Sequence, residues 1–215
     1  MGTHTAPSPA RRSGGLARNF ATPDGLLGRI AGRIMAWENA RANRLVVELL
    51  APGPGDRVLE IGCGPGTALA GAARGGATLL AGIDPSPVML AQSRRRLRRA
   101  GAGGRADLRR AAAEAIPHPE ASFTRVLSVH SLHHWDDVAL GVREAARVLA
   151  PGGRLALADR RRRPGTHLDP HARVLGEDDL TAICALAAEA GLDDVRIVEH
   201  DLGREILAVV SAGRR

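Results

Sequence analysis

Val58-Leu59-Glu60-Ile61-Gly62-Cys63-Gly64-Pro65-Gly66-Thr67 is the stretch that decides the fold of this chain. Its first four residues form a short apolar run with one acid, as in a buried strand, and three glycines spaced two apart follow. Glycine adopts positive φ and lets backbone N–H groups approach a ligand that a Cβ would keep away. A helix is expected to begin near Thr67, with the positive end of its dipole at the turn. The stretch therefore predicts a strand, a ligand-binding turn and a helix, with Glu60 at the edge of the site.

Length and composition indicate one domain with an N-terminal extension. The chain has 215 residues, enough for a full hydrophobic core, and no apolar run reaches the roughly 20 residues that span a bilayer. Its first residues are rich in small, polar and basic types and lack the apolar centre of a secretion signal. We expect a disordered tail over 1–22, helices that cover the site over 23–52, at about 24–33 and 35–50, and a ligand-binding domain over 53–215.

The charged residues and the cysteines indicate in which organisms and cellular compartment the protein occurs and which partners it binds. All thirty basic residues are arginine, and the formal net charge is +7. Arginine and alanine dominance without tyrosine indicates GC-rich codon usage, as in many bacteria, so the charge is weak evidence for a nucleic-acid partner. Cys63 and Cys184 show neither a disulfide framework nor metal-ligand spacing. We therefore expect a bacterial protein of the reducing cytoplasm that binds no metal.

Strand and helix patterns alternate along most of the chain. Strands are expected at 57–61, 78–83, 106–109, 125–129 and 154–158, and helices at 67–74, 87–100, 138–149 and 177–190. Two last strands, at 195–199 and 205–210, are joined by a short turn. The alternation predicts the α/β class, with a doubly wound, mainly parallel sheet that ends in a C-terminal antiparallel hairpin. Ligands bind such sheets at the carboxyl ends of the strands, where the glycine turn lies.

The glycine turn does not match the common phosphate-binding motifs. Thr67 stands where a dinucleotide fingerprint has its third glycine, and a phosphate P-loop needs a lysine that this chain lacks. Glu60 would oppose a pyrophosphate, but it suits a ligand that carries an ammonium or sulfonium charge. A second acid, Asp84, closes the next strand and can accept two hydrogen bonds from ribose hydroxyls. The pattern favours a ligand with a cationic end and a nucleoside end.

Three segments resemble one enzyme family. Glu60-x-Gly62-x-Gly64-x-Gly66 with Asp84 is similar to the cofactor site of class I S-adenosylmethionine-dependent methyltransferases. The segments Ser131–Trp135 and Arg147–Leu155 are similar to the small-molecule branch that includes the ubiquinone/menaquinone-biosynthesis-like enzymes. The resemblance spans about 45–210 and implies a Rossmann-like seven-stranded sheet, S-adenosylmethionine as cofactor with S-adenosylhomocysteine as product, and a small-molecule acceptor.

The resemblance also implies roles for single residues. Glu60 would lie near the amino group of the cofactor, and Asp84 would bind its ribose. The turn residues that would surround the methionine part are Gly62, Cys63, Gly64 and Gly66, and those around the adenine are Pro85, Met89, Ala113 and Glu114. The chain departs from the family pattern at Ala112, where many members carry an acid for the adenine amino group, and at Thr124, where the family favours aspartate.

His130 would face the methyl-transfer cavity and is the candidate general base, since a histidine pKa lies near working pH. We expect His133 and His134 to be structural, and Asn39 and Asn43 to be solvated amides rather than part of a lid.

One alternative function is that of a methyltransferase of RNA or DNA, which is not expected because the chain lacks an aromatic stacking platform and an Asn/Asp-Pro-Pro-Tyr/Phe motif. Another is a protein that binds the cofactor without methylating. The identity of the acceptor and the oligomeric state stay open.

Overall fold

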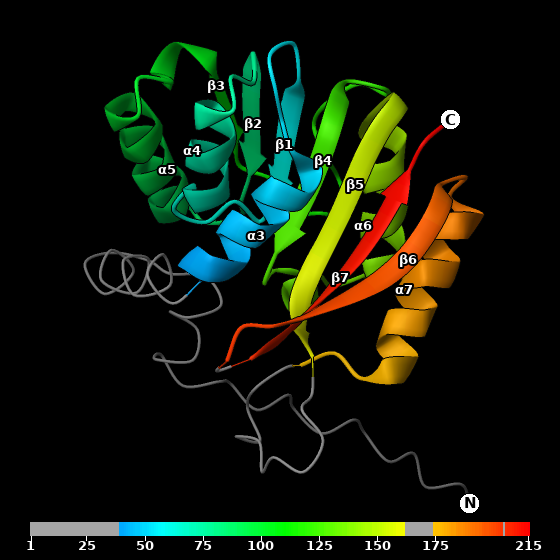
Figure 1. Ribbon diagram of the computed structural model, residues 1–215. Coiled ribbons are helices and arrows are strands. Elements are labelled where there is room, and N and C mark those ends of the chain that lie inside the picture. The colour runs from blue at the N-terminus through cyan, green and yellow to red at the C-terminus, as the bar shows by residue number, and fades with distance from the viewer. Residues whose placement is uncertain (1–38, 162–173, 204) are drawn as a thin grey trace, which may run out of the picture.

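A single seven-stranded sheet organises the chain (Figure 1). The computed structural model describes residues 39–161, 174–203 and 205–215. The strands follow the order β3-β2-β1-β4-β5-β7-β6, and all pair in parallel except β7, which runs antiparallel to both of its neighbours. Their bounds are Arg57–Ile61 for β1, Leu79–Ile83 for β2, Ala106–Arg109 for β3, Phe123–Val129 for β4, Leu149–Arg161 for β5, Asp193–Asp201 for β6 and Ile206–Gly213 for β7. The predicted fold class, including the C-terminal hairpin, is confirmed.

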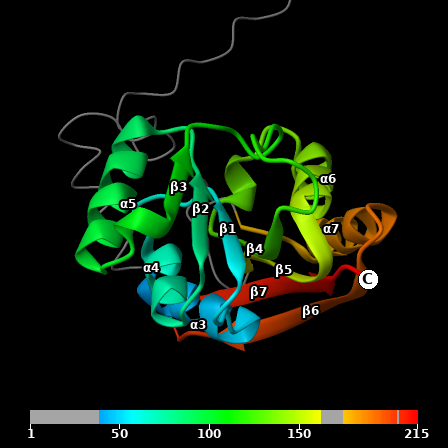
Figure 2. The same ribbon diagram turned by 90° about the horizontal axis from the view of Figure 1, so that it is seen from above.

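Helices cover both faces of the sheet (Figure 2). One face carries α3, α4 and α5, and the other carries α6 and α7, as a doubly wound sheet requires. The bounds are Ala40–Leu50 for α3, Thr67–Arg74 for α4, Pro87–Arg99 for α5, Val138–Val148 for α6 and Glu177–Glu189 for α7, with short 3₁₀ turns η1 at Gly103–Arg105 and η2 at Leu132–His134.

Each face of the sheet has its own apolar core. Neighbouring residues on β1 point in opposite directions, so Val58 packs in the cluster under α3 to α5 while Leu59 packs in the cluster under α6 and α7. Both side chains are almost fully buried. Because both faces are covered, the parallel strands consist of nearly continuous apolar runs, and the charged residues at their carboxyl ends stand out.

Local signals placed the helices well. Ser86 caps α5 by accepting a hydrogen bond from the backbone N–H of Met89, and Pro87 occupies the first helical position, as predicted. The expected helix at 67–74 is confirmed at both ends. The predicted tail over 1–22, the predicted helix over 24–33 and the first residues of the predicted helix over 35–50 lie outside the described residues.

The last three strands are longer than predicted. The strand expected at 154–158 extends over Leu149–Arg161, because β7 pairs with it continuously from Arg154 to Arg161. The hairpin strands are extended by the same pairing, and Glu205 immediately precedes β7 instead of belonging to it. No helix within the described residues has the length and apolar character needed to cross a membrane.

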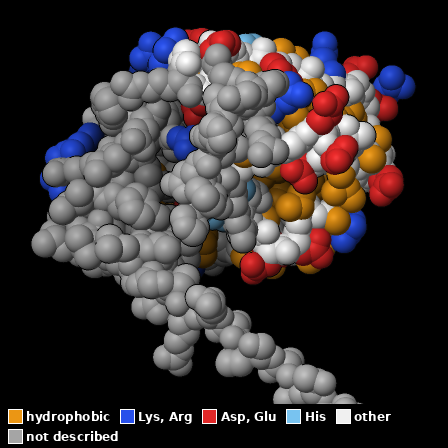
Figure 3. All heavy atoms as spheres, turned by 90° about the horizontal axis from the view of Figure 1, so that it is seen from below, with side chains coloured by type: hydrophobic (Ala, Val, Ile, Leu, Met, Phe, Trp, Pro, Cys, Tyr) orange, Lys and Arg blue, Asp and Glu red, His pale blue; other side chains and the backbone are white. Residues whose placement is uncertain are grey.

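The order of the strands determines where a ligand can bind. The chain first builds outward from β1 to β3 and then returns to add β4 on the other side of β1, so the crevice opens between β1 and β4. Seen from the end of the sheet with the carboxyl ends of the parallel strands, acidic and hydrophobic side chains lie side by side on the described part of the surface (Figure 3).

Candidate functional site

The three-glycine turn follows β1 and leads into α4. Gly62, Gly64 and Gly66 all have positive φ, at 69°, 47° and 74°. A Cβ on Gly62 would lie 2.5 Å from the side chain of Ser131, so this position has no room for another residue. The backbone of the turn is therefore packed against the segment after β4, and its conformation is the one that the sequence predicted.

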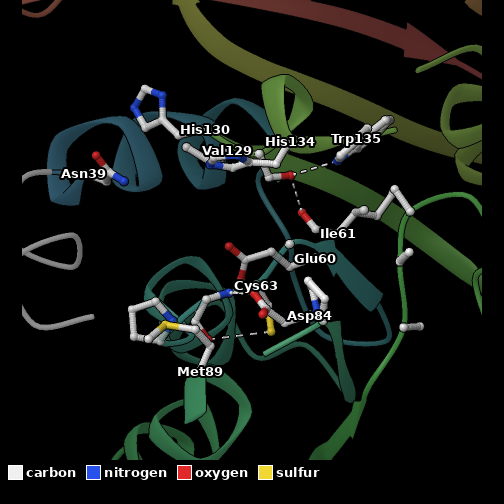
Figure 4. A pocket seen from close by; sticks show the side chains of 18 of the residues that line it. Asn39, Glu60, Ile61, Cys63, Asp84, Met89, Val129, His130, His134 and Trp135 are labelled. Atoms are coloured by element: carbon white, nitrogen blue, oxygen red, sulfur yellow. Dashed lines mark hydrogen bonds between the residues drawn. The ribbon is translucent and has the colours of Figure 1, made fainter. Parts of the chain in front are cut away.

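A cavity of about 320 Å³ opens beside this turn, within the range of small-molecule sites (Figure 4). It combines most of the predicted cofactor residues with the predicted base, His130. The predicted residues that line it are Glu60, Gly62, Cys63, Gly64, Asp84, Pro85, Met89, Ala113, Glu114 and His130. Gly66 is not among the lining residues; it lies one step back, where a side chain would collide with Ser93 on α5.

Glu60 lies deep in this cavity. Its side chain is 3% exposed, and one carboxylate oxygen accepts a hydrogen bond of 3.3 Å from the backbone N–H of Leu69. Burial, together with the negative charge of Asp84, raises the pKa of Glu60 to about 8. A buried carboxyl that is neutral at pH 7 gains its charge when a cation binds beside it, so Glu60 fits the amino end of a cationic ligand.

Asp84 links the turn to the next strand. One carboxylate oxygen accepts a hydrogen bond of 2.8 Å from the N–H of Gly64, and the other accepts one of 2.8 Å from the N–H of Ser86. Each oxygen keeps a second lone pair, so the carboxylate can still accept from a ligand hydroxyl. Burial raises the pKa of Asp84 above its usual range, although these two bonds oppose the shift.

The residues predicted to surround the adenine include one that already has a hydrogen-bond partner. Ala113 is buried, and the Glu114 carboxylate accepts a hydrogen bond of 3.1 Å from the N–H of Asp137, just before α6. Ala112, the first of the two positions noted above as departures, is exposed and lines the cavity. The other departure has a structural role: the Thr124 hydroxyl bridges Asp56 and the backbone of Arg57, and so joins the starts of β4 and β1.

His130 follows β4 with an unusual backbone conformation. Its φ is +53°, a left-handed value that costs energy in a residue with a Cβ, and its N–H donates to the carbonyl of Ala158. The side chain is 4% exposed, and its ring lies 3.5 Å from Asp159 and 3.4 Å from Glu205. Figure 4 shows His130 and Asn39 at one end of the cavity and Trp135 at the other.

The neighbouring histidines lie in η2 and differ in their surroundings. His133 Nδ1 lies 2.9 Å from a carboxylate oxygen of Asp159, which is completely buried near the carboxyl end of β5. His134 lines the cavity, and its ring stacks at a tilt against that of His133, with centroids 4.0 Å apart. The structural interpretation therefore suits His133 best, while His134 has access to a ligand.

The prediction that Asn39 and Asn43 are solvated amides is wrong for Asn43. Its side chain is 8% exposed and donates a hydrogen bond of 2.7 Å to the carbonyl of Asn39. Both residues line the cavity, because α3 packs against α4, β4 and β5 with its first residues beside the cavity. An amphipathic pattern gives the buried face of a helix but not what it packs against, so the sequence offered no reason to prefer the cavity.

Several site residues were not predicted. Asp159 lies near the carboxyl end of β5, as Glu60 lies near that of β1, and the apolar run Leu155–Ala158 before Asp159 was a usable signal. Ser131 Oγ contacts Ser128 Oγ, accepts a hydrogen bond from the Trp135 indole and donates to the carbonyl of Ile61. Glu205 reaches the site only through the hairpin fold. Within the described residues, no three His, Cys, Asp or Glu side chains are placed to hold a metal ion.

The sequence is similar to known methyltransferases. A family profile described as a methyltransferase domain matches residues 59–157. The 27-O-demethylrifamycin SV methyltransferase of Amycolatopsis mediterranei (strain S699) is 41% identical over 105 residues, which are 49% of this chain and 39% of that protein. The uncharacterised methyltransferase YdaC of Bacillus subtilis (strain 168) is 34% identical over 129 residues, 60% of this chain and 69% of YdaC. The chain spans 39% and 45% of the length of the first two curated relatives it matches.

Solved structures share the fold at low sequence identity. The [4+2]-cyclase SpnF superposes with a TM-score of 0.67 at 21% identity, and the match covers 81% of this chain and 81% of the cyclase chain. A geranyl diphosphate methyltransferase determined with S-adenosylmethionine superposes with a TM-score of 0.68 at 16% identity, over 92% of this chain and 94% of that one. At these identities the likeness shows the fold alone, and the fold supports more than one chemistry.

Proposed function

The chain belongs to the class I S-adenosylmethionine-dependent methyltransferases, and on this premise we propose that it transfers a methyl group from that cofactor to a small-molecule acceptor. One observation carries the proposal. A single cavity is lined by the buried acid Glu60, the glycine turn, the ribose-binding candidate Asp84 and the candidate base His130. This shared cavity supports the proposal that the cofactor and the acceptor bind side by side.

The residues that line the cavity support a proposed role for each part of the cofactor. We propose that Glu60 receives the amino group and that the turn from Gly62 to Gly66, with Cys63, surrounds the methionine part. Burial keeps the Cys63 thiol protonated by raising its pKa, so this side chain acts as a small apolar wall. Asp84 would hold the ribose, and the residues around the adenine would be Pro85, Met89, Ala113 and Glu114.

The protein's main contribution to the reaction would be to position the acceptor atom in line with the methyl group of the cofactor. When bound, the cofactor supplies a sulfonium whose methyl group is already activated for in-line displacement. The cavity walls then have to align the acceptor atom and exclude water, which contributes most of the rate in such reactions. His130 would accept a proton from an acceptor hydroxyl or amine, and no base is needed for an acceptor that is already nucleophilic.

The proposal also covers the origin of the protein, its location in the cell and its division into domains. The lysine-free, arginine-rich composition supports a bacterial origin, and two free cysteines support a cytoplasmic location. We propose that 53–215 is the methyltransferase domain and that 23–52 covers the site, since α3 at the end of this segment lines the cavity. Oxygen, nitrogen and carbon atoms all remain possible acceptor atoms.

Calorimetry with S-adenosylhomocysteine tests the cofactor assignment. We expect binding in the micromolar range, and no binding at high micromolar concentration would overturn the proposal. Turnover is the second test, since the fold also occurs in a cyclase. Production of S-adenosylhomocysteine that depends on a hydroxylated or amino acceptor supports the methyltransferase. Binding without turnover across a broad acceptor panel supports a non-methylating protein, and salt-dependent binding to RNA would support a nucleic-acid substrate.

A further inference from the structure

The ring of His130 is held on two sides by carboxylates from different strands. Nδ1 lies 3.5 Å from an oxygen of Asp159, near the carboxyl end of β5, and Nε2 lies 3.4 Å from an oxygen of Glu205, just before β7. Neither contact has hydrogen-bond geometry, so both are electrostatic contacts between buried groups. The left-handed backbone of His130 directs the side chain into this position at a cost in strain.

Glu205 is itself fixed from the outside. Its second carboxylate oxygen lies 2.5 Å from Nε of Arg160, and its side chain is 18% exposed. The Arg160 guanidinium also donates, at 3.4 Å, to the side-chain oxygen of Asn39, at the start of α3. A continuous series of contacts thus runs from the cavity wall at Asn39 through Arg160 and Glu205 to His130.

We propose that Glu205 is a positioning residue for His130: its carboxylate, anchored by Arg160, fixes the Nε2 side of the imidazole while Asp159 fixes the Nδ1 side. The inference rests on the proposed function, in which His130 serves as the base. It adds a residue from the C-terminal hairpin, remote in sequence from every motif of the cofactor site. An acceptor that takes its place beside Nε2 would displace the Glu205 oxygen that faces His130, while the second oxygen of Glu205 keeps its bond to Arg160.

This arrangement has a consequence for protonation. The charged groups around His130 are Asp159 and Glu205 in direct contact, His133 behind Asp159, and Arg160 behind Glu205. Burial lowers the pKa of His130, but the two carboxylates outweigh burial and leave it raised. His130 and Arg160 in turn lower the pKa of Glu205 against the effect of its burial. A base must lose its proton first, so Asp159 and Glu205 together raise the pH above which His130 can act.

The test compares two glutamates of the same hairpin. Glu205→Gln removes the charge beside His130 and keeps the shape of the side chain. Glu199→Gln is the matched control, because Glu199 on β6 pairs with Arg161 at 2.5 Å and contacts neither His130 nor Asp159 through any ion pair. Titration of ¹³C-labelled histidines by NMR, with the His130 signal assigned from a His130→Gln sample, gives the protonation midpoint without any need for turnover.

We expect Glu205→Gln to lower the His130 midpoint by about 1 pH unit, the usual effect of removing one nearby opposite charge, and Glu199→Gln to leave it unchanged. The acid limb of the kcat/KM profile should move down by the same amount. An unchanged His130 midpoint in Glu205→Gln would overturn the inference even if the enzyme is active. A shifted midpoint with no change in the rate profile would instead show that Glu205 acts on His130 but that His130 is not the base, which contradicts the proposed mechanism and leaves the contact intact.

Discussion

The side chain of Ser131 occupies the space into which any side chain on Gly62 would project: an added Cβ would lie 2.5 Å from both the Cβ and the hydroxyl of Ser131. The two residues come from the segments that follow β1 and β4, on either side of the crevice. The hydroxyl of Ser131 also donates to the carbonyl of Ile61, so the glycine turn is held by packing and by a hydrogen bond together.

The first prediction concerns Gly62→Ala. A left-handed alanine costs about 1–2 kcal/mol and overpacking adds about 1–3 kcal/mol, so the variant should lose both stability and cofactor affinity. Gly101→Ala is the control, since Gly101 has the same φ of 69° with nothing within 4 Å of an added Cβ. Urea denaturation measures the difference. Equal losses in the two variants would mean that the contact with Ser131 has no energetic weight.

The second prediction concerns Asp84→Asn. An amide has one oxygen where the carboxylate has two, so one of the backbone N–H groups, of Gly64 or Ser86, loses its acceptor and the ribose loses a charged one. We expect S-adenosylhomocysteine to bind about 10- to 100-fold more weakly, as measured by calorimetry. Asp107→Asn, at an ion pair on β3 away from the cavity, should bind normally. Wild-type affinity in Asp84→Asn would remove this residue from the cofactor site.

Residues close to one another in sequence were the predictable part of this site. The start of α5 at Ser86-Pro87, the glycine turn and the two acids near the carboxyl ends of β1 and β2 are each specified within a few neighbouring residues. Hydrogen-bonding groups and φ preferences act over that range, so the sequence pattern was enough to place them.

The acceptor half of the site depends on contacts between distant segments. Glu205 reaches His130 only because β7 lies next to β5, and the length of β5 depends on that same pairing. Asn43 faces the cavity because of the way α3 packs against α4, β4 and β5, which no periodicity in α3 itself indicates. Long-range packing of this kind leaves no pattern in the local sequence. The sequence therefore predicted His130 as the base but did not predict that Asp159 and Glu205 lie beside it.

The third prediction concerns the pH dependence of binding. With its pKa near 8, Glu60 is mostly protonated at pH 7, and a cationic ligand favours its ionised form. Binding of S-adenosylhomocysteine should therefore release up to one proton, and the affinity for this ligand should rise with pH until it levels off above about 8. Calorimetry in two buffers of different ionisation enthalpy measures the released proton. Glu60→Gln should release none and bind more weakly; identical heats in both buffers for the wild type would contradict the assignment.

The same acid affects the stability of the cofactor-free protein. A pKa raised from 4.5 in the unfolded chain to about 8 means that the native state holds the proton more tightly, so stability is greatest below the unfolded value and falls as pH rises through 8. The glutamine side chain in Glu60→Gln cannot ionise, so this variant should not lose stability in this way as the pH rises. We therefore expect the free energy of unfolding of the variant to increase relative to the wild type between pH 5 and pH 8, and a constant difference over that range would contradict the burial of this charge.

The last prediction concerns a helical glycine behind the cavity. Alanine in place of an exposed helical glycine normally stabilises a protein by up to about 1 kcal/mol. A Cβ on Gly141 of α6 would lie 2.7 Å from Cζ3 of the Trp135 ring, whose indole N–H is bonded to Ser131. Gly141→Ala should therefore destabilise the protein and displace an indole that lines the cavity, which Trp fluorescence and cofactor affinity would report. Gly71→Ala, on α4, meets only Val47 at 3.4 Å and should keep normal affinity. If both variants behave alike in thermal denaturation and binding, Trp135 is free to move and does not fix this wall of the site.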